Sequence, residues 1–261
     1  MGRFADAGEG VLFPLPLLEA AMGRVPEAVE GRPVALGVDV ARSIAGDLNS
    51  IARCAGGVLE VLATWRSPDL METVQRVLHV VAETGIRRLA VDVGGPGGGV
   101  ADRLRELGYG EVQPVHFGGG AIDPQRFRNR RAEMFWKLRE ALEKGTVGLA
   151  DDDEVQADLS ALRYVFTAAG LIQVESKDEV RARLGRSPDR ADALALALAA
   201  VEAGASGTLD VEAWRALASL NVEMTQAAPF ADLGGGHRWA DDLGVEDAVR
   251  EAWLQDHPEE R

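Results

Sequence analysis

The sequence predicts an α/β domain over residues 33–203, with a partly parallel sheet that opens with an antiparallel meander. Two observations support this fold class. Three strand-like segments follow one another directly between residues 34 and 65, and strand and helix patterns alternate after them. Consecutive strands favour antiparallel pairing, whereas strands separated by helices favour parallel pairing.

The opening meander is predicted from short apolar runs and one turn signal. Residues 34–40 form a short apolar run that contains Asp39, as a buried strand would. Residues 50–54 and 58–65 flank Gly56 and Gly57, a pair typical of a hairpin turn. These three segments are therefore expected to pair in sequence order.

The alternating part begins with a helix whose apolar residues recur along one face. A second apolar strand follows it and contains Asp92. A glycine-rich turn, another helix and a third strand complete this part. The predicted segments, in order, are helix 70–82, strand 89–93, turn 94–99, helix 100–107 and strand 112–117.

The last part of the domain is predicted to be mainly helical. Residues 131–143 read as a strong helix and residues 155–162 as a weaker one, and a short hairpin is expected across residues 164–175. An Ala/Leu-rich helix over 189–203 ends the domain, with Pro188 near its start, where proline is tolerated.

The flanking segments differ from the domain in composition. Residues 1–32 contain a proline-bearing apolar stretch and are expected to form an arm or linker. Residues 204–261 hold eight more acidic than basic residues and are expected to form an acidic C-terminal appendage. That tail carries over half of the net charge of −14, so the global sign does not exclude a nucleic-acid partner.

Composition excludes several classes of protein. A single cysteine, Cys54, allows neither an intrachain disulfide nor a zinc site made of cysteines. The chain has no apolar run of the length that spans a membrane. No membrane partner is therefore expected.

Two aspartates inside apolar strands are the strongest chemical signal. A buried carboxylate is costly unless it is paired or bound to a metal ion. Asp39 and Asp92 occupy similar places on strands that are expected to be neighbours, about 5 Å apart. Asp189 and Asp192 lie three residues apart at a helix start and so share one face. Spacing alone leaves metal binding and purely structural carboxylates equally open.

Several motifs resemble the nuclease domain of phage terminase large subunits. Gly37-Val-Asp-Val-Ala41, with Gly46-Asp47, resembles the first nuclease motif, and Val91-Asp92 resembles the second. The segment from Asn129 to Trp136 is similar to a helix of that family. Glu175-Ser-Lys-Asp178 and the run from Ser187 to Ala195 resemble its last segment. Together these motifs cover roughly residues 34–203.

The resemblance implies a ribonuclease H-like fold and a metal-dependent endonuclease that cleaves double-stranded viral DNA during genome packaging. It implies two Mg²⁺ or Mn²⁺ ions per site, and hard cations of this kind suit carboxylate oxygens. Asp39, Asp92 and Asp192 would be catalytic metal ligands, and Asp189 a further ligand. Asp47 would position water or substrate, although a solvated loop acid is the simpler interpretation. Lys177 would contact a phosphate, or would be a surface lysine.

The resemblance also implies partners: double-stranded DNA, a portal, a small terminase subunit and a packaging ATPase, in the host cytoplasm. No G-x-x-x-x-G-K-[ST] phosphate loop occurs here, so either this is an excised nuclease domain or the ATPase is a separate chain.

A basic segment is the expected DNA contact. Residues 125–139 contain six basic residues and one acid, interleaved with aromatic residues. Arg128, Arg130 and Arg131 are expected to follow the phosphate chain, with little sequence preference. The alternative is an amphipathic helix with a solvated basic face.

Three other functions remain open from the residues. A junction-resolving nuclease shares the fold and the metal chemistry. A non-catalytic module could dock on a portal through the acidic tail. An ATP-binding domain of the actin and sugar-kinase type would need two related halves with phosphate loops, which this chain is too short to supply.

Overall fold

The computed structural model describes residues 10–27, 33–109 and 111–203. Its main sheet has six strands in the order β6-β5-β2-β3-β4-β7. The strands are β2 (Ala35–Asp39), β3 (Asn49–Ala55), β4 (Val58–Trp65), β5 (Leu89–Asp92), β6 (Val112–Val115) and β7 (Gly148–Leu149). The expected mixed sheet of five or more strands is confirmed.

The pairing follows the predicted pattern. The first three main-sheet strands form an antiparallel meander, β2 to β3 to β4. The strands β5 and β6 then add in parallel on the other side of β2, after helical crossovers. The short strand β7 pairs in parallel with β4 at the opposite edge and was not expected from the sequence.

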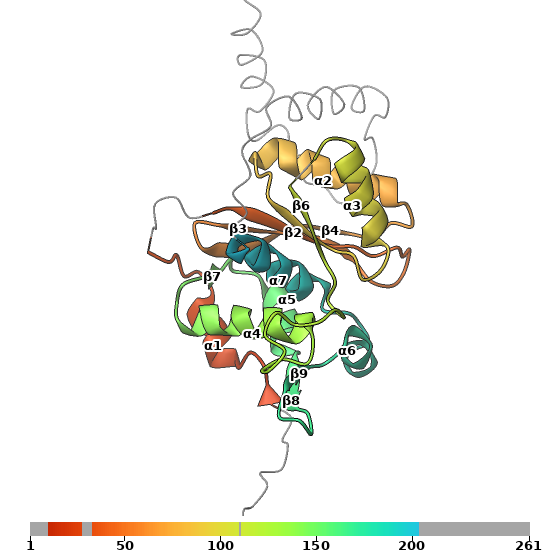
Figure 1. Ribbon diagram of the computed structural model, residues 1–261. Coiled ribbons are helices and arrows are strands. Elements are labelled where there is room, and N and C mark those ends of the chain that lie inside the picture. Colours follow the sequence, from red (N-terminus) through yellow and green to blue (C-terminus); the bar gives the residue numbers. More distant parts are fainter. Residues whose placement is uncertain (1–9, 28–32, 110, 204–261) are drawn as a thin grey trace, which may run out of the picture. The chain divides into compact units, whose positions relative to one another are not determined.

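Helices cover both faces of this sheet (Figure 1). One face packs against α2 (Leu70–Thr84) and α3 (Gly97–Glu106) through a core that includes Leu36 and Val38. The other face packs against α7 (Asp189–Glu202), with α4 (Arg130–Glu143) and α5 (Asp153–Ser160) beyond it. The side chains of a strand alternate between faces, so β2 serves both cores.

The helix α7 rests directly on β2. A Cβ atom added to Gly37 would lie 2.2 Å from the carbonyl oxygen of Ala193 and 2.3 Å from the amide nitrogen of Ala197. Glycine at position 37 therefore permits the backbones of helix and strand to touch. Gly97 permits a similar approach at the start of α3, where a Cβ would lie 2.0 Å from the carbonyl oxygen of Asp92.

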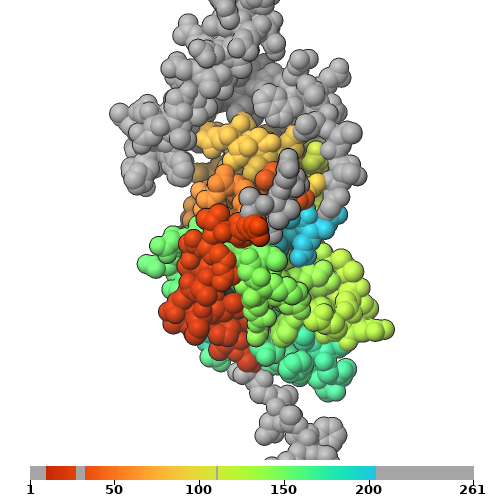
Figure 2. All heavy atoms as spheres, turned by 90° about the vertical axis from the view of Figure 1, so that its left-hand side faces the viewer, coloured from red at the N-terminus to blue at the C-terminus, as the bar shows by residue number. Residues whose placement is uncertain are grey.

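The N-terminal segment is part of the packed domain. The strand β1 (Gly10–Val11) pairs with β8 (Arg163–Phe166), which pairs with β9 (Ile172–Val174) in a second, three-stranded sheet. The helix α1 (Leu15–Ala21) contacts α4, α5 and β7, and Figure 2 shows this segment in red against the green residues. Leu12, Phe13 and Leu18 are fully buried. Residues 10–27, which belong to the segment expected as a packed arm or linker, thus supply core residues and a strand.

The remaining helix, α6 (Lys177–Leu184), begins at a capping box formed by Ser176 and Glu179. In the part of the chain that the structure describes, no helix is long and apolar enough to cross a membrane. The expected acidic appendage, residues 204–261, lies outside the described residues.

Candidate metal centre

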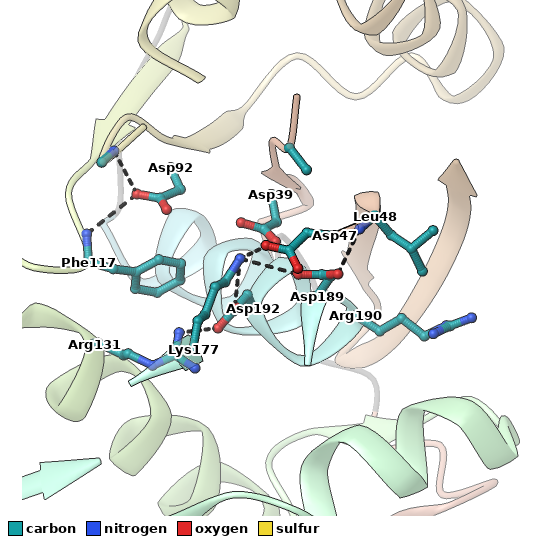
Figure 3. Close-up of polar contacts among 12 residues, drawn as sticks. Asp39, Asp47, Leu48, Asp92, Phe117, Arg131, Lys177, Asp189, Arg190 and Asp192 are labelled. Atoms are coloured by element: carbon teal, nitrogen blue, oxygen red, sulfur yellow. Dashed lines mark hydrogen bonds and ion pairs between the residues drawn. The ribbon is translucent and has the colours of Figure 1, made fainter. Parts of the chain in front are cut away.

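Three carboxylates meet where β2 ends and α7 begins. Asp39 is the last residue of β2, and Asp189 and Asp192 lie on the first turn of α7. Each carboxylate offers one oxygen atom, and these three atoms lie within 4.8 Å of one another. All three residues are buried, with exposed fractions of 1%, 2% and 0%. The close approach of α7 at Gly37 brings the two elements together. Figure 3 shows the three aspartates gathered around Lys177.

Lys177 supplies the positive charge at the centre of this cluster. Its Nζ lies 2.7 Å from Asp39 Oδ2, 3.0 Å from Asp192 Oδ2 and 3.4 Å from Asp189 Oδ1. Lys177 is the first residue of α6. The capping box formed by Ser176 and Glu179 fixes the start of that helix. The sequence assigned Lys177 to a phosphate contact, whereas the structure turns its amine toward the carboxylates.

Burial sets the protonation of this cluster. Burial raises the pKa of the Asp39 carboxyl well above its usual range; Lys177 opposes that rise, and the negative charges of Asp192 and Asp189 add to it. Burial also raises the pKa of Asp189, again against the effect of Lys177. Burial alone would lower the pKa of Lys177, but the three carboxylates raise it above its usual range. The lysine is therefore charged, and its positive charge faces three acids.

The donor set fits a hard divalent cation. Three carboxylates face two cations, Lys177 and Arg131, and carboxylate oxygens are the ligands that Mg²⁺ and Mn²⁺ prefer. Asp39 Oδ1 is buried and has no hydrogen-bond partner within the described chain. An unsatisfied buried carboxylate oxygen is costly, and a cation would satisfy it.

Asp92 stands beside the cluster and outside the group of three. Val38 of β2 pairs with Val91 of β5, and Asp39 and Asp92 are the next residues of these two parallel strands. The two aspartates are therefore neighbours. Its Oδ1 accepts hydrogen bonds from the Gly94 and Phe117 amides, at 3.0 and 3.5 Å. Oδ2 receives neither of these bonds. Figure 3 shows Asp92 to one side of the other three aspartates.

Arg131 is buried against the cluster, which corrects its expected role in DNA contact. Its guanidinium forms an ion pair with Asp192, and the two side chains are 7% and 0% exposed. Its Nε donates to the carbonyl of Glu175 at 3.1 Å, and its Cζ lies 4.7 Å from the ring centroid of Phe135. A guanidinium held by these contacts cannot follow a phosphate chain. It holds Asp192 Oδ1 and leaves Oδ2 toward Lys177.

The other expected site residues are partly engaged. Arg130 forms an ion pair with the buried Glu133 and is largely covered, whereas Arg128 is exposed. Asp47 pairs with Arg181, so it is neither a free loop acid nor a member of the carboxylate group. Its neighbour Leu48 donates its amide to Asp189 Oδ2 at 2.8 Å, a contact that the sequence gave no reason to expect.

A second buried acid supports the helix that carries the cluster. Asp158 on α5 forms an ion pair with Arg186 and accepts a hydrogen bond from the Arg190 amide, in the first turn of α7. Burial raises the pKa of Asp158 from 3.8 to about 6, although Arg186 and Arg190 oppose the shift. Because the folded-state value is the higher one, the carboxyl stabilises the fold fully below about pH 4. That contribution is lost as the pH rises through about 6.

Asp158→Asn removes this titration. We therefore expect the variant to gain stability relative to the parent between pH 4 and pH 7, by at most about 3 kcal/mol for a shift of about two pKa units. Urea unfolding at pH 4 and pH 7 measures the change, with the exposed acid variant Asp102→Asn as control. A stability difference that does not vary with pH would contradict this role of Asp158.

Comparison with known proteins identifies the fold. No protein-family model matches the chain, and no curated protein matches it. Among solved structures it resembles the nuclease domain of the large terminase subunit gp2 of bacterial virus Sf6, with a TM-score of 0.60 and 19% identity. The match covers 72% of this chain and 98% of that one.

Two further structures contain metal ions. A variant of the Sf6 domain with manganese and beta-thujaplicinol gives a TM-score of 0.63 at 18% identity, over 72% of this chain and 98% of that one. The large terminase nuclease from thermophilic phage G20c with bound magnesium gives 0.54 at 18% identity, over 75% and 98%. The chain thus has the ribonuclease H-like fold of the nuclease domains of large terminase subunits.

Proposed function

We propose that this chain is a metal-dependent endonuclease that cleaves double-stranded viral DNA during genome packaging. The observation that carries the proposal is the buried group of Asp39, Asp189 and Asp192, on a fold shared with terminase nuclease domains. Each buried acid raises the cost of burying its neighbours, a cost that Lys177 and Arg131 offset in part and that a bound cation would offset further.

The carboxylates would hold Mg²⁺ or Mn²⁺, and we propose two ions per site. Asp39, Asp92, Asp189 and Asp192 would hold these ions. Bound there, the ions would supply Lewis-acid stabilisation of the phosphodiester and activation of the attacking water.

The chain's own residues prepare this site. Arg131 fixes the Asp192 carboxylate from one side, and the Leu48 amide fixes Asp189 from another. The Gly94 and Phe117 amides orient Asp92. Residues that orient metal ligands in this way are worth about 10- to 100-fold in affinity or activity.

We further propose that the enzyme acts in the host cytoplasm with a portal, a small terminase subunit and a separate packaging ATPase. A junction-resolving nuclease is the alternative with the same chemistry. Comparison of branched and linear duplex substrates separates the two.

The test is cleavage of supercoiled plasmid DNA over a series of divalent metals. We expect activity with Mg²⁺ or Mn²⁺ and none in chelator. Asp92→Asn should lower cleavage strongly while leaving the thermal unfolding midpoint unchanged, since Asp92 lies at a strand end and is partly exposed. Full activity in chelator, or a fully active Asp92→Asn enzyme, would exclude the proposed metal site.

A further inference from the structure

Two loops meet at the edge of the sheet that carries the carboxylates. The strand β2 ends at Asp39, which pairs with Ser50 near the start of β3, and Ser50 pairs with Thr64 near the end of β4. The loop of residues 40–48 and the loop of residues 66–69 therefore emerge at this same edge. The Ser43 amide donates to the Ser67 carbonyl at 3.1 Å and joins them.

Each loop sends an arginine across to the other. Arg42 Nε donates to the carbonyl oxygen of Pro68 at 2.9 Å, and Arg66 Nε donates to the carbonyl oxygen of Gly46 at 3.0 Å. Both bonds use Nε and leave the terminal nitrogens of the guanidinium groups available. The exchange anchors two exposed guanidinium groups on a closed pair of loops.

Within the described residues, neither arginine has an acidic partner. The nearest acids along the chain are engaged elsewhere: Asp47 pairs with Arg181, and Asp69 caps α2 by accepting from the Met71 amide. Most other arginines of the described chain are ion-paired, including Arg53 on β3 and Arg76 on α2. Two anchored, unneutralised guanidinium groups are typical of phosphate recognition.

The loop that carries Arg42 is anchored at both ends to the carboxylate cluster. The first of the two loops starts at Asp39 and ends where the Leu48 amide bonds Asp189, so both of its ends touch the cluster. Arg42 and Arg66 therefore lie on loops that leave the sheet at the edge where Asp39 ends β2.

We infer that Arg42 and Arg66 form a phosphate-binding pair that positions the DNA backbone beside the carboxylate cluster. The inference rests on the proposed nuclease function and names a DNA contact other than the basic segment around Arg128. Contacts to phosphates carry no sequence information, so the pair fixes the register of the DNA without selecting bases.

The experiment measures binding of the full chain to a duplex oligonucleotide by fluorescence anisotropy, in chelator, over a range of salt concentrations. The double variant Arg42→Gln/Arg66→Gln should weaken binding and lower the slope of log affinity against log salt by about two, about one per phosphate contact. The control Arg103→Gln/Arg105→Gln removes the same charge from ion-paired positions on α3 and should leave the slope unchanged.

A second variant separates phosphate binding from loop structure. Arg42→Lys/Arg66→Lys keeps both charges but loses the Nε bonds, and we expect it to retain most of the salt slope. A glutamine variant with wild-type affinity and slope overturns the inference, as does a lysine variant as defective as the glutamine variant. Either result leaves the nuclease proposal intact if the parent chain cleaves DNA, whereas a parent that neither binds nor cleaves DNA overturns that proposal itself.

Discussion

Asp39→Asn should lower metal-dependent DNA cleavage by more than about 100-fold, because even residues that only orient a metal ligand contribute about 10- to 100-fold. The substitution keeps the size of the side chain and removes its charge. Asp39, like Asp192, carries a buried oxygen without a hydrogen-bond partner in the described chain. Its loss should therefore reduce Mn²⁺ binding as well as cleavage.

The measurement combines plasmid cleavage rates with Mn²⁺ binding followed by electron paramagnetic resonance of the free ion. Asp102→Asn, an exposed acid on α3, serves as the matched control and should behave as the parent does. The fold should survive, because burial already penalises the charged form of Asp39. Parent-like cleavage together with parent-like Mn²⁺ binding would remove Asp39 from the site.

Lys177→Met should destabilise the protein in chelator by about 3–5 kcal/mol, the usual cost of leaving a buried charge without its partner. The amine is the positive charge shared by three buried carboxylates, so its removal leaves them to repel one another. A divalent cation bound by the same oxygens should restore part of the loss, because a ligand that binds only the folded state stabilises it.

Urea unfolding in chelator and in MnCl₂ tests this expectation. Lys144→Met removes an exposed lysine that pairs with Glu140 on α4, and it should have a small effect in both solutions. If Lys177→Met were equally unstable with and without Mn²⁺, the carboxylates would not share a cation site. If it were as stable as the parent in chelator, the lysine would not neutralise them.

The sequence predicts most of the site because its signals are local. Asp39 ends an apolar strand, and spacing puts Asp189 and Asp192 on one helix face, whereas only the family resemblance brought the strand and the helix together. The meander and the alternation after it follow from apolar periodicity and the glycine pair at 56–57. These features depend on neighbours in sequence.

The rest depends on contacts between distant segments. Arg131 lies in a basic run, which favours a solvated interpretation, and only the packing of α4 against α7 shows that it is buried beside Asp192. Lys177 reaches Asp39 across 138 positions of the chain. The second sheet depends on β1, a strand of two residues that has no periodicity to detect.

The contact between β2 and α7 at Gly37 determines the spacing between this strand and this helix. With no side chain between the strand and the helix at Gly37, backbone thickness alone determines how far apart the facing aspartates lie. Core side chains elsewhere can change in size and shape without altering that separation. The spacing between Asp39 and the first turn of α7 is thereby insulated from changes in the surrounding interior.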